Sequence, residues 1–246
     1  MKISLLFFSI VFLVNGQLLA QRGKNGSHTV TAANAILNSY TSLTSNASAG
    51  QSVITVASNS MVGGFFNGVL TPGDLILIVQ MQGASMNVDT YAANEFVTSN
   101  GQFWGPYTTP IGHLNDWNQH IQLWGEILNY NNAGKFELAE VRSLAGANSI
   151  SLMCPLVNNY SISGRVQVVR VPRFVNLTLN SNTSAVPTPW NGTVGGVVAV
   201  EVDGTLTLNA NGSISASGSG FRGGVTEDQT LGSPPGNVND LSLIHI

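Results

Sequence analysis

The sequence predicts an all-β protein, built as a small antiparallel barrel or sandwich followed by the start of a β-helix or of a second β-sheet. Short apolar or alternating runs recur between turn signals rich in Gly, Pro, Asn and Asp, as in antiparallel sheets. No helical period persists over three turns. Hydrophobic residues make up 43% of the 246 residues, which suffices for a core, and charged residues only 9%. The expected surface is therefore neutral and hydrogen-bonding.

The barrel or sandwich domain is expected over residues 51–175. The run "LILIVQ" follows the turn signal "TPGD" and is typical of a strand buried on both faces. Asp74, the last residue of that signal, is expected to cap the turn. "KFELAEVRSL" alternates, turns at "AGAN" and resumes as "SISLMCPL", and "GRVQVVRVPRF" forms a further strand. Short strands spaced by turns favour an antiparallel barrel or sandwich.

A long segment, residues 84–130, interrupts these strands and exceeds the length of an ordinary connection. It holds three of the four tryptophans of the chain. One interpretation is a binding insert whose aromatic rings stack on sugars or on a protein partner. The other is that the rings pack the segment onto the barrel. The candidate ligand-stacking residues are Trp104, Tyr107, Trp117 and Trp124.

The longest periodic signal runs from Val198 to Ala216. Every even position is apolar or glycine, and every odd position except Ala199 is polar. Two-residue hairpins at "DG" and "NG" would place apolar residues opposite polar ones, because residues flanking such a turn share a face. We therefore expect the edge or first coil of a β-helix over residues 197–224, with a sandwich of bulged turns as the alternative. Residues 176–196 are expected to be a linker.

The ends of the chain predict export and a truncated reading frame. Residues 1–20 combine a lysine with an apolar run too short to span a bilayer, which is typical of a signal peptide. The fragment is expected not to span a membrane, and to be secreted or on a bacterial cell surface. A polar leader is expected over residues 21–50 and a Gly/Pro-rich loop over 225–240. Residues 241–246 match the translation of a transposase adapter used in sequencing libraries, and are expected to be an artefact.

No catalytic residue, cofactor or metal site is expected. Glu137 and Glu140 lie three apart on a predicted strand, so they point to opposite faces and cannot form a carboxylate pair. The single cysteine, Cys154, follows an apolar run and is expected to be buried. The net charge of −3 produces no field that would attract nucleic acid, so no nucleic-acid partner is expected.

Five segments follow one another along the chain: "GDLILIVQMQGA", "YNNAGKFELAEV", "VQVVRVPRF", "WNGTVGGVVAVEVDGTLTL" and "ISASGSGFRGG". Together they resemble the N-terminal region of very large secreted, adhesin-like or gliding-associated surface proteins of Bacteroidetes and myxobacteria. The resemblance covers residues 51–224. It implies export and a β-rich surface architecture, and it maps no catalytic residue onto this chain.

Three functions agree with these observations. The first is a non-enzymatic N-terminal module of a secreted or cell-surface adhesin-like protein that binds glycan or another surface polymer. The second is the non-catalytic N-terminal part of a secreted polysaccharide-degrading enzyme whose catalytic domain is missing from this chain. The third is a structural cap of a long β-solenoid, because terminal units protect stacked edges.

Overall fold

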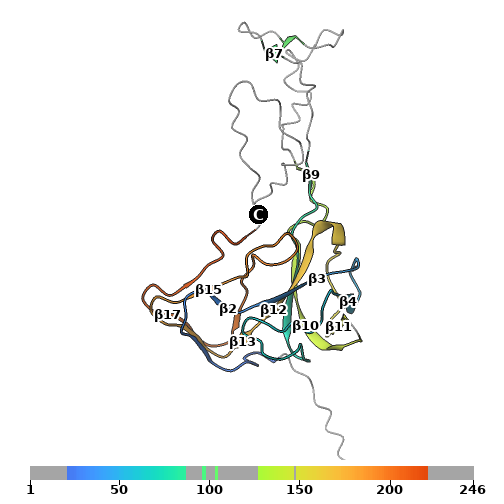
Figure 1. The fold of residues 1–246 in the computed structure, drawn as a ribbon. Coiled ribbons are helices and arrows are strands. Elements are labelled where there is room, and N and C mark those ends of the chain that lie inside the picture. The colour runs from blue at the N-terminus through green and yellow to red at the C-terminus, as the bar shows by residue number, and fades with distance from the viewer. Residues whose placement is uncertain (1–20, 87–95, 98–102, 105–126, 147, 221–246) are drawn as a thin grey trace, which may run out of the picture.

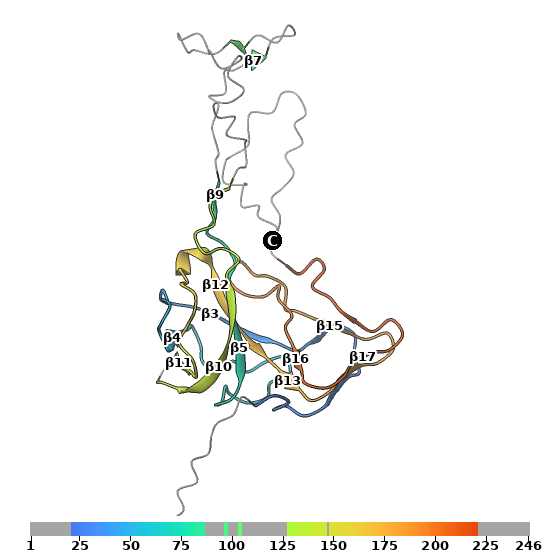
Figure 2. The ribbon, with the colours of Figure 1, turned by 180° about the vertical axis from the view of Figure 1, so that it is seen from behind.

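The computed structural model describes residues 21–86, 96–97, 103–104, 127–146 and 148–220. Their strands form an antiparallel sheet that curls into a barrel, and beside it a stack of parallel strands (Figure 1, Figure 2). The predicted all-β class, with an antiparallel barrel-like sheet and a β-helix-like stack, is therefore confirmed. The expected signal peptide, C-terminal loop and adapter-derived residues lie outside the described residues.

The antiparallel sheet has six strands. In spatial order they are β3 (Ser39–Ser42), β12 (Val166–Val171), β5 (Leu75–Gln80), β10 (Phe136–Leu144), β11 (Ser149–Leu152) and β4 (Val53–Thr55). A short 3-10 helix, η2 (Ile162–Gly164), precedes β12. Leu43, just after β3, forms an antiparallel bridge with Val56, just after β4. The two edge strands therefore meet at one end, and the sheet curls on itself.

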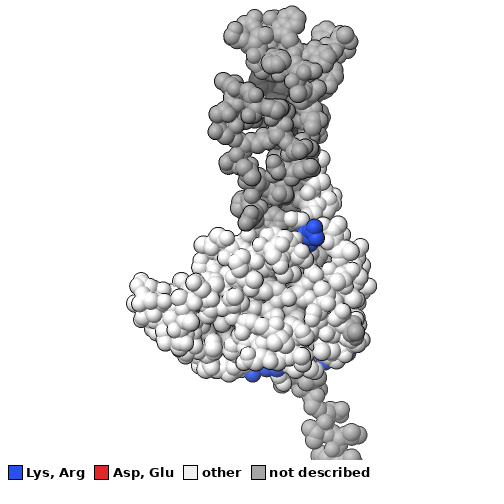
Figure 3. All heavy atoms as spheres, in the orientation of Figure 1, with Lys and Arg blue, Asp and Glu red and all other residues white. Residues whose placement is uncertain are grey.

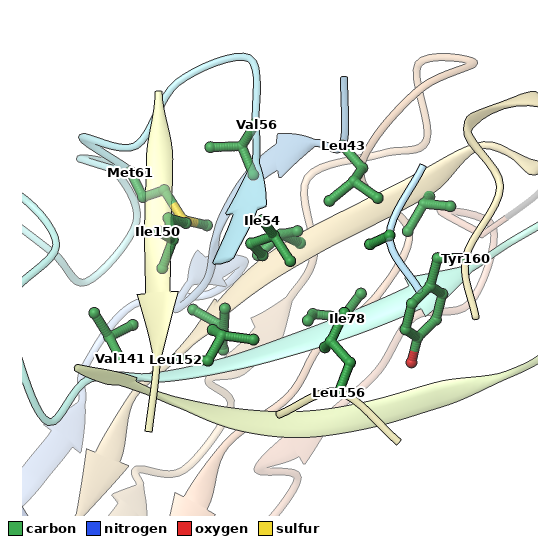
Figure 4. Close-up of a cluster of buried hydrophobic side chains, with 14 of the residues drawn as sticks. Leu43, Ile54, Val56, Met61, Ile78, Val141, Ile150, Leu152, Leu156 and Tyr160 are labelled. Atoms are coloured by element: carbon green, nitrogen blue, oxygen red, sulfur yellow. The ribbon is translucent and has the colours of Figure 1, made fainter. Parts of the chain in front are cut away.

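Apolar side chains fill the inside of the curled sheet (Figure 4). Ile78, Val141 and Ile150 are completely buried there. Successive side chains of a strand point to opposite faces, so every second residue of each strand enters this core. Tyr160 lies at the same core, and burial raises the pKa of its hydroxyl, with a further contribution from Glu137.

The strand that is buried on both faces is β12, where all six residues are buried. Its outer face is in contact with residues 187–199: Gln167 accepts a hydrogen bond from the Gly195 amide (2.9 Å) and donates to the Gly195 carbonyl (3.1 Å). β5 was the strand expected to be buried on both faces, but Leu77 and Val79 are only half-buried. The overlying segment reaches β12 and leaves part of β5 open.

Tyr40 ties the same segment to the barrel, because its hydroxyl donates to the Val197 carbonyl at 2.7 Å. Burial raises its pKa from 10.0 to about 12. Between pH 10 and 12 the Tyr40 hydroxyl therefore ionises in the unfolded chain but not in the folded one. This difference favours unfolding, so we expect the free energy of unfolding to fall as pH rises from 10 towards 12. Denaturant unfolding at stepped pH measures this fall. In Tyr40→Phe the fall becomes smaller but persists, because Tyr160 acts in the same direction; an unchanged slope would contradict the assignment.

The parallel strands form three stacked coils. Coil 1 contains β1 (His28–Val30) and β2 (Ala35–Ile36); coil 2 contains β13 (Arg173–Phe174), β14 (Leu177–Leu179) and β15 (Ser184–Val186); coil 3 contains β16 (Glu201–Val202), β17 (Leu206–Leu208) and β18 (Ser213–Ile214). β14 lies between β1 and β17, and β15 lies between β2 and β18. All these pairs are parallel and in register, as in a β-helix.

The barrel is inserted between coil 1 and coil 2. Leu177 of β14 pairs with Leu206 of β17, which is 29 residues later (206 − 177), but also with His28 of β1, which is 149 residues earlier (177 − 28). All six barrel strands lie within that longer interval. The chain thus completes part of one coil, forms the barrel, and returns to continue the stack.

This insertion changes the predicted domain limits. Residues 21–50, expected to be a leader, contain β1, β2 and β3. Residues 176–196, expected to be a linker, contain β14 and β15. The barrel strands run from Ser39 to Val171 instead of over 51–175. Strands of two to four residues carry little local pattern, and their partners lie far away in the sequence, so only the assembled coils reveal them.

The described part of the periodic stretch, residues 197–220, is a coil, as expected, and it forms no hairpin. Among the described strands β17 pairs with β14 alone, in parallel, and Val200, Val202 and Ile214 pack against the buried core of the coils. The "NG" signal is a corner. Asn211 there has φ 61°, Asn182 has φ 60° at the same corner of coil 2, and their side chains are hydrogen-bonded at 2.9 Å.

The prediction for Cys154 was wrong, because its side chain is exposed. β11 ends at Leu152, which is buried, and the chain then leaves the sheet in a bend. The strand therefore ends two residues before Cys154.

Candidate functional site

The aromatic insert is described only in part. β6 (Ser85–Met86) pairs with β9 (Ile127–Asn129), so the insert leaves and re-enters the barrel on adjacent strands. Further along, β7 (Phe96–Val97) pairs with β8 (Phe103–Trp104). The structure does not describe the side chains of the four predicted stacking residues, which are Trp104, Tyr107, Trp117 and Trp124. Their role in binding or packing stays a prediction.

A buried ion-pair cluster joins the barrel to coil 1. Asp74, in the turn before β5, contacts the guanidinium of Arg170 at 2.6 Å and the ammonium of Lys24 at 2.7 Å. Only 4% of the Asp74 side chain and 5% of the Arg170 side chain are exposed. Asp74 also accepts the Thr71 amide at 2.8 Å, which confirms its predicted role in the turn. The ion pairs could not be predicted from the sequence, because both cations come from distant segments.

A second cluster joins the barrel to coils 2 and 3. Arg173, the first residue of β13, donates to Glu140 of β10 at 2.9 Å and to Glu201 of β16. Burial opposes the charge of Arg173, but its hydrogen bonds to the two carboxylates outweigh this and raise its pKa. Each arginine therefore lies where two parts of the fold meet, and the two clusters hold the barrel and the coils in one arrangement.

The acidic side chains of the described residues all have structural partners. Glu137 accepts the amides of Val157 and Asn158, and points away from Glu140 as predicted. Asp203 lies 3.9 Å from Arg22 at the surface. No group of three or more His, Cys, Asp or Glu side chains that could hold a metal occurs within the described part of the chain. The acidic side chains found there are therefore engaged in contacts within the fold.

The outer face of the sheet β1–β14–β17 is an uncharged polar surface, which we call the coil face. Its central column is Thr29, Thr178 and Thr207, which are in register on the three strands. Leu177 and Leu179 are completely buried, so Thr178 between them points outward. Two flanking columns complete the coil face: Ser27, Asn176 and Thr205 on one side, and Thr31, Asn180 and Asn209 on the other.

Stacking orders the coil face. Neighbouring strands lie ~4.8 Å apart, and alternate residues of one strand ~6.6 Å apart, so hydroxyl and amide groups repeat in two directions. The Asn176 side chain donates to Ser27 at 3.3 Å and accepts the Thr205 amide at 2.8 Å, which links the three coils along one column. The coil face is therefore a regular array of hydrogen-bonding groups held by the stack beneath it.

Few charged side chains of the described residues lie on the face shown in Figure 3. On the face shown in Figure 3, basic side chains lie at the margins of the described part, and no acidic side chain of that part is visible. No helix among the described residues is long and apolar enough to cross a membrane. A ligand that meets this surface would encounter mainly neutral hydrogen-bonding groups.

No family model matches the chain, and no curated protein matches it. Its fold is similar to solved structures of phage tailspikes. The Gp54 tailspike of Acinetobacter baumannii bacteriophage AP22, solved in complex with A. baumannii capsular saccharide, has 16% identity, a TM-score of 0.29, and coverage of 77% of this chain and 26% of that chain.

The tailspike protein gp49 from Pseudomonas phage LKA1 has 15% identity, a TM-score of 0.28, and coverage of 77% and 28%. The tailspike gp61 of Pseudomonas phage phi297 has 11% identity, a TM-score of 0.28, and coverage of 72% and 20%. The chain thus spans about a quarter of the length of these structures. At these identities and TM-scores, the likeness carries no conclusion about what this chain binds.

Proposed function

We propose that the chain is a non-enzymatic N-terminal module of an exported, adhesin-like surface protein, and that it binds an uncharged extracellular glycan through the coil face. The single observation that carries the proposal is the in-register array of uncharged hydroxyl and amide side chains on β1, β14 and β17. The resemblance to secreted adhesin-like proteins and the pattern of residues 1–20 support export to the cell surface.

The small net free energy of each hydrogen bond favours a polymer over a small sugar as the ligand. One exposed hydroxyl that binds a sugar exchanges a bond to water for a bond to ligand, so the net gain per contact is only about 0.5–1.5 kcal/mol. The coil face is a sheet surface on which many such contacts lie side by side. A polymer that engages several columns at once gains from their high effective concentration. The proposed ligand is therefore a neutral polysaccharide.

Thr178→Lys tests the coil face, because Thr178 occupies the centre of its central column. A long cationic side chain there displaces a neutral polymer from the contacts on both neighbouring strands. We expect binding to immobilised neutral polysaccharides to weaken about tenfold or more, the change produced by a loss of about 1.4 kcal/mol. Binding is measured on a glycan array and by sedimentation with insoluble polysaccharides.

The matched control is Ser151→Lys. Ser151 is half-buried on a middle strand of the barrel, β11, and points outward because Ile150 and Leu152 are buried. Ser151→Lys should bind as the unchanged chain does. If both variants bind equally well, the ligand does not use the coil face. If the folded, unchanged chain binds no glycan at all, the proposed function is wrong.

A further inference from the structure

The loop between β4 and β5 contacts the coils through two phenylalanines. Phe65 packs edge-on against His28 of coil 1 and Phe174 of coil 2, with ring centroids 5.0 Å apart in each case. Phe66, which is 5% exposed, lies beneath the guanidinium of Arg170, whose Cζ is 4.0 Å from the centre of the ring. This loop therefore connects the barrel to the core of the coils, and its position depends on Arg170.

The backbone of the loop is anchored on both sides of Asn67. On one side, Phe66 exchanges two backbone hydrogen bonds with Gly63, at 2.9 and 3.0 Å. On the other side, the Gly68 carbonyl accepts a hydrogen bond from the guanidinium of Arg170 at 2.7 Å. Asn67 is thus the single residue between two fixed points of the chain.

The side chain of Asn67 and the amide of Gly68 are free. Both residues are exposed, and no described residue is hydrogen-bonded to either group. A Cβ built on Gly68 would meet no atom within 4 Å beyond its chain neighbours. Because glycine lets other groups approach its backbone closely, the Gly68 amide can reach the side-chain carbonyl carbon of the preceding asparagine.

Three other asparagines of the described part precede a glycine, and each is held by hydrogen bonds. Asn25 accepts the Arg173 amide through Oδ1 at 2.8 Å, and Asn191 accepts two backbone amides through Oδ1, both at 2.9 Å. Asn211 donates to the Asn182 side chain at 2.9 Å. The glycine amides that follow Asn25 and Asn211 are also bonded, at 2.9 and 2.7 Å. Of these four asparagines, the fold leaves Asn67 free to react.

We propose that Asn67-Gly68 is a site of spontaneous deamidation, and that the folded chain directs the reaction to this step. The Gly68 amide nitrogen bonds to Cγ of Asn67 and gives up its proton, and the side-chain nitrogen leaves with that proton as ammonia. Water then opens the succinimide, adding its hydroxyl to one carbonyl carbon and its proton to the ring nitrogen. Water is the sole co-reactant, and no group is oxidised or reduced. The rate depends on how readily nitrogen and carbon approach in the correct orientation.

The reaction has a structural consequence for the loop. Opening of the ring at the backbone carbonyl carbon of Asn67 gives isoaspartate, in which the main chain runs through the side chain and is one carbon longer. Since Phe66 and Gly68 are both anchored, the added atom displaces at least one of them. We expect the hold of Arg170 on the loop, and the contact of Phe65 with the coils, to weaken. The proposal does not depend on the coil face or on its ligand.

Ageing of the full chain at mildly alkaline pH tests the selectivity. Mass spectrometry of proteolytic peptides measures the acid form at each step, and enzymatic methylation measures isoaspartate. We expect Asn67 to react severalfold faster than Asn25, Asn191 and Asn211 in the folded chain. In urea, where no hydrogen bond holds the side chains, the four rates should become similar, because each asparagine precedes glycine. Equal rates in the folded chain, or a faster reaction at one of the other three, overturn the proposal.

Gly68→Ala tests the attacking group. The new methyl group has open space, and Gly68 is not in the left-handed region, so the variant should unfold at the same urea concentration as the unchanged chain. The methyl group nevertheless crowds the amide nitrogen, so deamidation of Asn67 should slow severalfold. The matched control is Gly220→Ala, which also has open space and should leave the rate at Asn67 unchanged. An undiminished rate in Gly68→Ala contradicts the proposed reaction.

A comparison with Asn67→Asp separates the added charge from the longer backbone. This variant has the carboxylate of the aged chain on a main chain of normal length. We expect the isoaspartate form, purified from aged protein, to unfold at a lower urea concentration than Asn67→Asp. Equal unfolding of the two forms would overturn the inferred loosening of the loop.

Discussion

Replacing Asp74 by asparagine is expected to lower the free energy of unfolding by about 3–5 kcal/mol, the cost of leaving a buried charge without its partner. Arg170 is 4% exposed and keeps its guanidinium 2.6 Å from the Asp74 carboxylate. Burial lowers the pKa of Arg170, and attraction to Asp74 opposes this effect. Without the carboxylate, the buried cation loses that compensation. Urea unfolding followed by circular dichroism measures the change.

The matched control for this prediction is Asp203→Asn. Asp203 is paired with Arg22 at 3.9 Å, but 46% and 72% of the two side chains are exposed. Exposed pairs of this kind contribute about 0–1 kcal/mol, because water and salt screen them. If Asp74→Asn were no more destabilising than Asp203→Asn, the buried cluster would not hold the barrel to coil 1.

Truncating Leu177 to alanine is expected to destabilise the folded chain by about 2–5 kcal/mol, and the same truncation of Leu206 by less than about 1 kcal/mol. The two leucines occupy the same position in successive coils and begin the same "LTL" motif. They differ in burial, because Leu177 is 0% and Leu206 is 44% exposed. A truncated buried side chain leaves a cavity, whereas water fills the space left by an exposed one.

Chemical unfolding of both variants, followed by circular dichroism, tests this contrast. Equal losses of stability in the two variants would mean that the difference in burial between Leu177 and Leu206 does not hold in solution.

Both buried ion-pair clusters lie near the point where the chain leaves the barrel for coil 2. Arg170 is the fifth residue of the last barrel strand, β12, and Arg173 begins coil 2 three residues later. Each arginine binds carboxylates from segments distant in sequence. Breaking either cluster should therefore loosen the barrel relative to the coils before it disturbs either core.

Local pattern alone was enough to predict several elements. The period of two over residues 198–216 favoured a coil over two-residue hairpins, because a side-chain alternation that continues through two such turns would place apolar residues opposite polar ones. The alternation of β10 correctly placed Glu137 and Glu140 on opposite faces. Such features depend only on neighbours in sequence, so the residues themselves carry the information.

Other elements could not be predicted, because their partners are distant. β1 has three residues and β2 has two. They form coil 1 only because β14 and β15 pair with them after the chain has formed the barrel. The partners of Asp74 were missed for the same reason. Cys154 was expected inside because its run is apolar, but the chain turns out of the sheet just before it.

The sequence by itself determined that this is an all-β chain with little charge, a buried apolar core and a coil-like C-terminal part, since composition and side-chain period set which surfaces can leave water. Only the tertiary structure decided that the barrel interrupts the coils, which threonines share one column, and where the buried charges pair. Each of these depends on contacts between segments far apart in the chain, whose register is set by packing and by hydrogen bonds between strands, and no local pattern encodes that register.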